Sequence, residues 1–144
     1  MQKQFITRSA DDTIALGREL APLLRQAHIV LLRGDLGAGK TTMVKGIAEA
    51  FEAAAQEDVT SPTFTLVHEY RGPERTLYHI DLYRIETERE LYTLDLDDLI
   101  VEDGNILLIE WGEKFERFVH ERDVEIAIER DGDTRRTIIV STKE

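Results

Sequence analysis

The sequence lacks cysteine altogether, so none of its 144 residues can form a disulfide or a thiolate metal site. Small secreted domains commonly depend on disulfides, and their absence here is consistent with a reducing compartment. Long apolar runs are also missing, since no stretch approaches the ~20 residues that span a bilayer. Residues 1–12 lack the apolar segment of a signal peptide. We therefore expect a soluble, cytoplasmic protein that makes no membrane contact.

Basic residues are scarce relative to acidic ones. The chain has 18 Lys and Arg against 29 Asp and Glu, which gives a formal net charge of −11. Phosphate backbones attract positive charge, so a domain this acidic should bind nucleic acid poorly by itself. The same charge is also typical of a surface that simply keeps a protein soluble. If the pathway involves RNA, we expect another subunit to hold it.

The pattern of apolar residues predicts alternating strands and helices. Strands are expected over residues 5–6, 28–33, 63–70, 77–83, 106–109, 124–129 and 137–141. Helices are expected over residues 9–25, 40–51 and 113–120, and short broken helices over 86–99, with Pro22 kinking or ending the first. We predict one domain, residues 1–144, with an α/β fold: a P-loop NTPase-like three-layer sandwich whose mixed, mostly parallel sheet carries a C-terminal β-hairpin.

The most informative segment joins a strand to a helix through a glycine-rich turn. Residues 34–41 read GDLGAGKT and fill every fixed place of the pattern G-x-x-x-x-G-K-[ST]. The apolar run at residues 29–32 before it is typical of a buried parallel strand. After it, apolar residues recur at helical spacing as far as Phe51. Strand, loop and helix in this order predict a phosphate-binding loop, although an ordinary glycine-rich turn beside an exposed lysine is the alternative.

The chemistry of this loop follows from its backbone. Glycines allow successive N–H groups to converge on phosphate oxygens, and the helix that follows adds the positive end of its dipole. Lys40 supplies a positive charge for the β and γ phosphates, while the Thr41 hydroxyl is suited to bind Mg²⁺. The loop thus predicts a nucleoside triphosphate and Mg²⁺ as ligands, and the base is left open at this point. The residues expected to bind the nucleotide here are Gly37, Ala38, Gly39, Lys40, Thr41 and Thr42.

A nucleotide–Mg²⁺ site also needs a carboxylate, and two candidates follow predicted strands. Glu110 ends the run at residues 106–109, and Asp81 ends the run at residues 77–80. Ligands of open α/β sheets gather at these carboxyl ends of strands. Either residue can hold the metal directly or through water, and the other can polarise the attacking water. The alternative for each is a solvated charge at the end of a strand.

Three further features could have either a functional role or a purely structural one. Residues 59–64 place three hydroxyls around a proline and are a candidate switch for the γ phosphate, or else a polar loop entering a strand. Trp111, directly after Glu110, is a candidate lid or partner anchor, or part of the core. His79 has no paired metal ligands at a suitable spacing, so we expect a structural role for it.

Four motifs occur in one order along the chain: GDLGAGKTT at residues 34–42, TSPTF at 60–64, HIDLYR at 79–84 and EWGE at 110–113. Together they resemble the TsaE family, also called YjeE, and the resemblance covers nearly the whole chain. It implies a P-loop fold, and ATP hydrolysis that is weak in the isolated protein. It also implies a complex with TsaB and TsaD, in which TsaD modifies adenosine 37 of tRNAs reading ANN codons. In that family the ATPase supports repeated turnover of the complex, which makes threonylcarbamoyladenosine.

The same resemblance implies roles for individual residues. Lys40 and Thr41 would bind phosphate and Mg²⁺, and Glu110 would be the second protein ligand of the metal, so that Lys40, Asp81 and Glu110 form the catalytic set. Asp81 would be the essential carboxylate, either behind the metal or positioning water. The switch residues implied by the resemblance are Thr60, Ser61 and Trp111, and the adenine contacts are Thr13 and Arg136.

Two other functions use the same loop. A small-molecule kinase usually carries an Arg-rich lid, whereas the candidate lid at residues 86–103 is acidic and has only Arg89. A nucleotide-sensing module would bind without needing to hydrolyse, and sequence alone separates it poorly from an ATPase. A GTPase is disfavoured because the sequence contains no N-K-x-D guanine motif.

Overall fold

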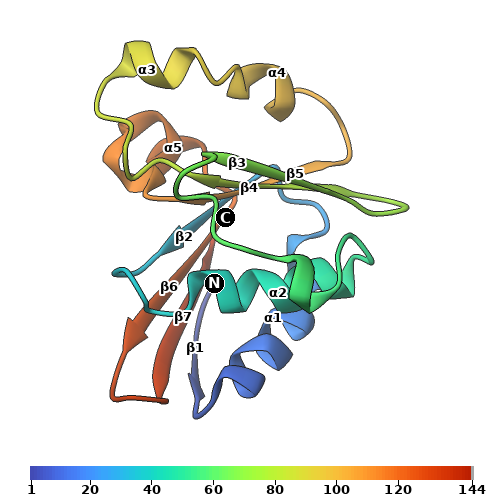
Figure 1. Cartoon of the computed structure of the whole chain (residues 1–144), viewed down its shortest axis with the longest axis vertical. Coiled ribbons are helices and arrows are strands. Elements are labelled where there is room, and N and C mark those ends of the chain that lie inside the picture. Colours follow the sequence, from blue (N-terminus) through green and yellow to red (C-terminus); the bar gives the residue numbers. More distant parts are fainter. Residues whose placement is uncertain (144) are drawn as a thin grey trace.

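The computed structural model describes residues 1–143 as a single mixed sheet with helices on both faces (Figure 1). The strands are β1 (Gln2–Thr7), β2 (Ile29–Arg33), β3 (Val67–Arg71), β4 (Thr76–Asp81), β5 (Asn105–Glu110), β6 (Val124–Arg130) and β7 (Arg136–Thr142). The helices are α1 (Ala10–Leu24), α2 (Lys40–Ala50), η1 (Gln56–Asp58), α3 (Glu88–Tyr92), α4 (Leu96–Ile100), η2 (Gly112–Lys114) and α5 (Glu116–Glu121). None of these helices combines the length and hydropathy needed to cross a membrane.

The sheet has a parallel centre and antiparallel edges. Its order is β1-β7-β6-β2-β5-β4-β3, and the four strands from β6 to β4 run parallel. Hairpins add β7 and β3 in the antiparallel sense, and β1 returns to pair with β7 at one edge. Because β2 and β5 lie in the middle of the parallel part, their carboxyl ends open onto one edge of the sheet.

Two apolar clusters cover the two faces of the sheet. Side chains of β2 alternate between them, with Val30 and Leu32 packed on the side of α1 and α2 and Leu31 on the side of α5. Figure 1 shows α1 and α2 on one side of the sheet and α3, α4 and α5 on the other. Burial on both faces explains why β2 and β5 read as continuous apolar runs in the sequence.

Helices α1 and α2 approach each other more closely than ordinary side chains allow. A Cβ atom added to Gly46 would lie 1.9 Å from the carbonyl oxygen of Ile14, and one added to Gly17 would lie 2.5 Å from that of Met43. The two helices therefore meet backbone to backbone. This contact fixes α2, and with it the glycine-rich turn at its start.

The predicted fold class is confirmed, including the C-terminal hairpin and the two short helices within residues 86–99. The predicted strand at residues 63–70 is wrong in its first half, because β3 begins only at Val67. Before it, the N–H of Leu66 donates to the carbonyl of Pro62, and Leu66 has a φ of 71°. Pro22 lies inside α1, which ends two residues later at Leu24.

Candidate functional site

A cavity of about 260 Å³ opens at the carboxyl ends of the central strands. It brings together residues from the glycine-rich loop, the start of α2, the segment before β3, and the last residues of β4 and β5. Its lining residues are Leu36, Gly37, Gly39, Lys40, Thr41, Thr42, Ser61, Thr63, Asp81 and Glu110. The two carboxylates predicted from separate strand ends therefore face the same space as the predicted phosphate loop.

The loop presents backbone donors to this cavity. Gly39, the N-cap of α2, has a φ of 115°, in the left-handed region that a residue with a Cβ adopts only with strain. The helix then begins at Lys40, so the N–H groups of its first residues have no partner within the helix. These unpaired amides and the positive helix end make the edge of the cavity suited to an anion.

The Lys40 side chain crosses the loop and is buried, with 5% of its surface exposed. Its Nζ donates to the carbonyl oxygen of Gly34 at 2.5 Å and lies 3.5 Å from Oε1 of Glu110. The same ammonium lies 4.5 Å from the centre of the Trp111 ring. A buried ammonium is stable only when it is paired, and here a carboxylate, a carbonyl and an aromatic face share that role.

Glu110 ends β5 and is 4% exposed. One carboxylate oxygen, Oε1, faces Lys40, and the other, Oε2, lies 2.5 Å from Nε2 of His79. His79 is completely buried on the neighbouring strand β4. The expected structural role of this histidine thus takes a specific form, a hydrogen bond to a carboxylate of the site. Sequence reasoning missed the pairing because the two residues lie 31 positions apart.

Asp81 ends β4 directly beside Glu110 in the parallel pairing of β4 with β5, and is 2% exposed. Its Oδ1 accepts the N–H of Tyr83 at 2.8 Å, and its Oδ2 accepts the hydroxyl of Thr63 at 3.0 Å. The Thr63 hydroxyl is in turn 2.7 Å from that of Ser61. A chain of hydrogen bonds therefore joins the carboxylate to the segment before β3.

That segment is the predicted switch, and only some of its residues line the cavity. Ser61 lines the cavity, but Thr60 does not: its N–H donates to the Tyr70 hydroxyl at 3.3 Å. His68 hydrogen-bonds both the Thr60 carbonyl oxygen, at 3.2 Å, and the Thr65 hydroxyl, at 2.6 Å. Burial raises the pKa of the Tyr70 phenol above its ordinary value. Thr63, inside the predicted segment, is the member that contacts Asp81.

Trp111 contacts the site through Lys40 rather than by lining the cavity. Its backbone has a φ of 63°, and its ring meets that of Tyr83 edge to face at 5.1 Å between centroids. The residue is partly buried, and its indole Nε1 is buried with no hydrogen-bond partner within residues 1–143. This position is compatible with the predicted lid.

A second cavity, of about 160 Å³, adjoins the first and shares Gly39 and Thr42 with it. The predicted adenine contacts Thr13 and Arg136 both line this cavity. Arg136 reaches across from β7 and donates through Nε to the carbonyl oxygen of Ala38 at 2.7 Å. The Thr13 hydroxyl is largely hidden, 2.7 Å from the hydroxyl of Thr7. The two cavities together offer space on both sides of the start of α2.

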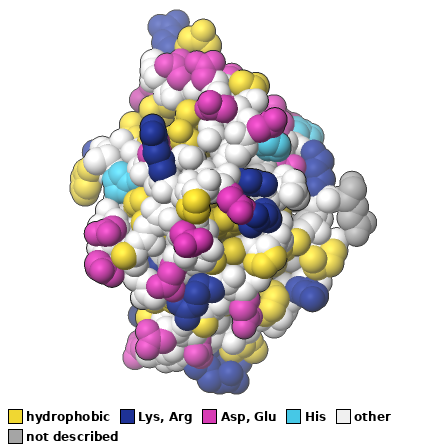
Figure 2. Space-filling model, turned by 90° about the vertical axis from the view of Figure 1, so that its right-hand side faces the viewer, with side chains coloured by type: hydrophobic (Ala, Val, Ile, Leu, Met, Phe, Trp, Pro, Cys, Tyr) yellow, Lys and Arg dark blue, Asp and Glu magenta, His cyan; other side chains and the backbone are white. Residues whose placement is uncertain are grey.

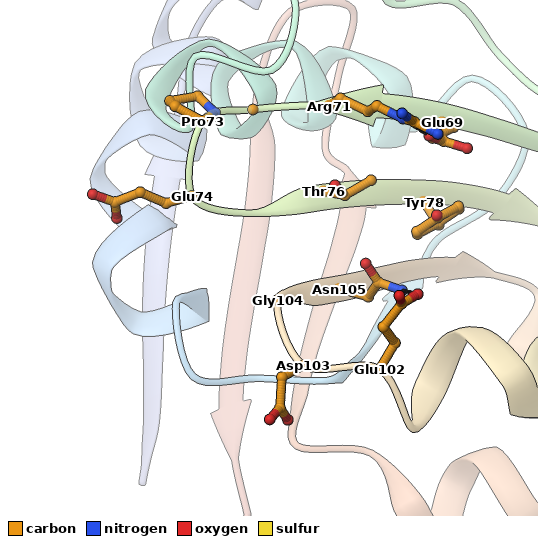
Figure 3. A pocket seen from close by; sticks show the side chains of 11 residues that line it. Glu69, Arg71, Pro73, Glu74, Thr76, Tyr78, Glu102, Asp103, Gly104 and Asn105 are labelled. Atoms are coloured by element: carbon orange, nitrogen blue, oxygen red, sulfur yellow. Dashed lines mark hydrogen bonds and ion pairs between the residues drawn. The ribbon is translucent and has the colours of Figure 1, made fainter.

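A cavity larger than the first lies elsewhere, at the opposite ends of β4 and β5 (Figure 3). It measures about 400 Å³, and its side chains come from β3, β4, the turn that joins them and the loop before β5. Four of the lining residues are acidic: Glu69, Glu74, Glu102 and Asp103. This charge disfavours phosphate, so size alone does not identify the nucleotide site.

The oxygen donors at the first cavity suit a hard cation that shares its coordination with a ligand. Thr41, Asp81 and Glu110 supply a hydroxyl and carboxylates, which are the groups that Mg²⁺ prefers. Within residues 1–143, no group of three or more His, Cys, Asp or Glu side chains is arranged to hold a metal by itself. A metal at this cavity would thus need oxygens from a bound ligand, as Mg²⁺ commonly does in phosphate sites.

Comparisons with known proteins agree on one family. The family model described as "Threonylcarbamoyl adenosine biosynthesis protein TsaE" matches residues 7–138. A protein of Aquifex aeolicus named tRNA threonylcarbamoyladenosine biosynthesis protein TsaE is 44% identical over 78% of this chain and 78% of its own. A protein of the same name from Treponema pallidum is 38% identical over 94% of this chain and 98% of its own. The crystal structure of Bacillus subtilis YdiB superposes with a TM-score of 0.74 at 30% identity, over 99% of this chain and 86% of that chain.

Proposed function

The chain belongs to the TsaE family, and from that premise we propose that it is the ATP-binding, ATP-hydrolysing subunit of a tRNA-modifying complex. The complex would make threonylcarbamoyladenosine at position 37 of tRNAs reading ANN codons. In this proposal the chain, as one cytoplasmic domain spanning residues 1–144, supports repeated turnover of TsaB and TsaD and contacts tRNA only through them.

One observation carries the proposal: the phosphate loop and two strand-end carboxylates meet at one cavity. Residues 37–42 would bind the triphosphate through backbone N–H groups, and Lys40 would neutralise its β and γ oxygens. The adjoining cavity, lined by Thr13 and Arg136, is where we propose that the adenine is bound. Arrival of the triphosphate would give the buried ammonium a second anionic partner besides Glu110.

Thr41 and Glu110 are the residues that would hold Mg²⁺ together with phosphate oxygens. The metal, when bound, would neutralise charge that develops on the phosphate oxygens as the γ phosphoryl is transferred. Two side chains of the protein contribute directly: Lys40 would hold the phosphates, and Oε1 of Glu110 faces the same ammonium at 3.5 Å.

Asp81 is proposed to position the attacking water. Water attacks the γ phosphorus, the bond from that phosphorus to the β–γ bridging oxygen breaks, and ADP and phosphate leave. The Asp81 carboxylate lies at the cavity and bonds the Thr63 hydroxyl, so movement of the segment before β3 would change its orientation. The switch residues Thr60, Ser61 and Trp111 would then link the state of the nucleotide to the surface that partners meet.

Calorimetry and phosphate-release assays test this function. We expect ATP to bind with Mg²⁺, hydrolysis to be slow for the chain alone, and turnover to rise when TsaB, TsaD and tRNA are added. A protein that binds no ATP would refute the site, and unchanged binding and turnover on mixing would refute the partners. Consumption of ATP without phosphate release, in the presence of an acceptor, would indicate a small-molecule kinase instead.

A further inference from the structure

We propose that His79 is a positioning residue: its ring Nε2–H holds one oxygen of Glu110 and leaves the other oxygen to serve the nucleotide site. The inference rests on the proposed function, in which Glu110 binds Mg²⁺, and deepens it. It assigns a role to the histidine of the HIDLYR motif, which belongs to neither the phosphate loop nor the candidate switch.

The sheet itself brings these side chains together. In the parallel pairing of β4 with β5, His79 lies opposite Leu108 and Asp81 opposite Glu110. Residues two apart on a strand share a face, so His79, Asp81 and Glu110 all project from the face that carries Leu108, on the side of α1 and α2. Nε2 of His79 then lies 2.5 Å from Oε2 of Glu110, with the imidazole fully buried.

The surroundings of the ring decide which nitrogen carries the proton. A carboxylate only accepts hydrogen bonds, so Nε2 of His79 must be the donor to Glu110. The other nitrogen, Nδ1, is buried and has no hydrogen-bond partner within residues 1–143. A proton on Nδ1 alone would bury an unpaired N–H and set the Nε2 lone pair against the carboxylate. We therefore assign the proton to Nε2.

The two oxygens of the Glu110 carboxylate therefore have different partners. Oε2 of Glu110 is engaged by the histidine, whereas Oε1 points to Lys40 at 3.5 Å, on the side of the cavity. The hydrogen bond restrains rotation of the Glu110 carboxylate. The side chain therefore loses less conformational freedom when a metal and nucleotide bind. Without the ring donor, Oε2 would be a buried acceptor that has lost its partner, and the carboxylate would be free to rotate away from its present orientation.

A pair of substitutions tests the proposal through Mg²⁺ rather than activity. ATP affinity is measured by calorimetry with Mg²⁺ and with EDTA, and the ratio gives the enhancement by the metal. We expect His79→Leu to lower that enhancement by about 10- to 100-fold, with little change in EDTA. His79→Gln keeps an N–H near the same place and should restore most of it, and His28→Leu, at an exposed histidine, is the matched control. An unchanged enhancement in His79→Leu, or no rescue by Gln, would overturn the inference.

Glu110→Gln separates this inference from the proposed function. Loss of the enhancement in Glu110→Gln but not in His79→Leu would retain Glu110 as the metal ligand and reject the role of the histidine. Retention of the enhancement in Glu110→Gln would reject both. If the variants do not fold, long-range ¹H–¹⁵N NMR of the unaltered protein decides. A proton on Nε2 of His79 supports the proposal, and a proton on Nδ1 alone overturns it.

Discussion

At the residue scale, the site depends on a buried positive charge that is already paired. Lys40 is held by Gly34, Glu110 and Trp111, so its ammonium lies in a fixed place. No basic side chain other than Lys40 lines this cavity in the described chain. A ligand with several anionic oxygens therefore depends on this one side chain for its charge-assisted hydrogen bonds.

Lys40→Ala should weaken ATP binding by about 10- to 100-fold, because hydrogen bonds from a charged donor are worth about 1.5–3 kcal/mol. Calorimetry with Mg²⁺ present measures the change. The charge-matched control is Lys3→Ala, at an exposed position on the edge strand β1, and should bind normally. Equal affinity for Lys40→Ala and the unaltered chain would refute the role assigned to this lysine.

Asp81→Asn should abolish hydrolysis while leaving ATP binding intact. The substitution keeps the size of the side chain but removes the charge that orients water, for which we expect a loss of about 100-fold or more in turnover. Phosphate release and calorimetry separate the two effects, and Asp103→Asn, at the distant acidic cavity, is the control. If partner-dependent tRNA modification survives without hydrolysis, the chain acts as a nucleotide sensor.

The sequence predicts individual residues of this site but not how those residues pair across the sheet. Lys40 and Thr41 are readable because the motif fixes them within one short segment. The pairing of His79 with Glu110 depends on the register between β4 and β5, which no local pattern specifies. Asp81 and Glu110 were found as separate strand ends, and only the parallel pairing makes them neighbours.

At the element scale, the phosphate loop is supported by the contact between α1 and α2. Gly46 has no room for a side chain because the Ile14 carbonyl oxygen lies where its Cβ would be. The predicted helices at these positions are confirmed, but the sequence alone did not reveal that their backbones touch. Such an approach depends on how two helices pack in three dimensions. A single glycine within a helical segment does not by itself indicate that another backbone lies against it.

Gly46→Ala should destabilise the protein by about 2 kcal/mol or more, since overpacking typically costs 1–3 kcal/mol. Helix propensity alone would favour alanine by about 1 kcal/mol, so the sign of the effect is diagnostic. Urea denaturation measures the free energy of unfolding. Ala50→Gly, exposed at the end of α2, is the control for propensity and should cost no more than about 1 kcal/mol. A stabilised Gly46→Ala variant would contradict the close contact.

The segment before β3 shows why a strand prediction failed. Apolar and β-branched residues at 63–67 favour a strand, but the hydroxyl of Thr63 bonds Asp81 and that of Thr65 bonds His68. The Leu66 N–H also donates to the Pro62 carbonyl oxygen, and together these hydrogen bonds hold the backbone in turns instead of a ladder. The contact with Asp81 of β4 and the local turn together override the strand propensity of these residues.

At the scale of the whole molecule, the net negative charge limits how strongly the isolated chain can bind nucleic acid. The net charge is −11, and the face drawn in Figure 2 shows acidic and basic side chains interspersed. Because affinity for a nucleic acid backbone comes mainly from clustered Lys and Arg, we expect the acidic chain to bind tRNA weakly by itself.

The isolated chain should bind tRNA more weakly than a dissociation constant of about 10⁻⁴ M at physiological salt. Fluorescence anisotropy with labelled tRNA measures this, and TsaB with TsaD, under the same conditions, serves as the positive control. Micromolar binding by the chain alone would contradict the inference that tRNA is contacted only through partners.

The central claim is that ATP and a divalent cation meet between the phosphate loop and the strand-end carboxylates. A crystal structure with a non-hydrolysable ATP analogue and Mn²⁺, located by anomalous scattering, tests it most directly. We predict the metal beside the Thr41 hydroxyl and Oε1 of Glu110, directly or through one water, with the triphosphate on the amides of residues 37–42. Metal and triphosphate bound away from these residues would contradict the account.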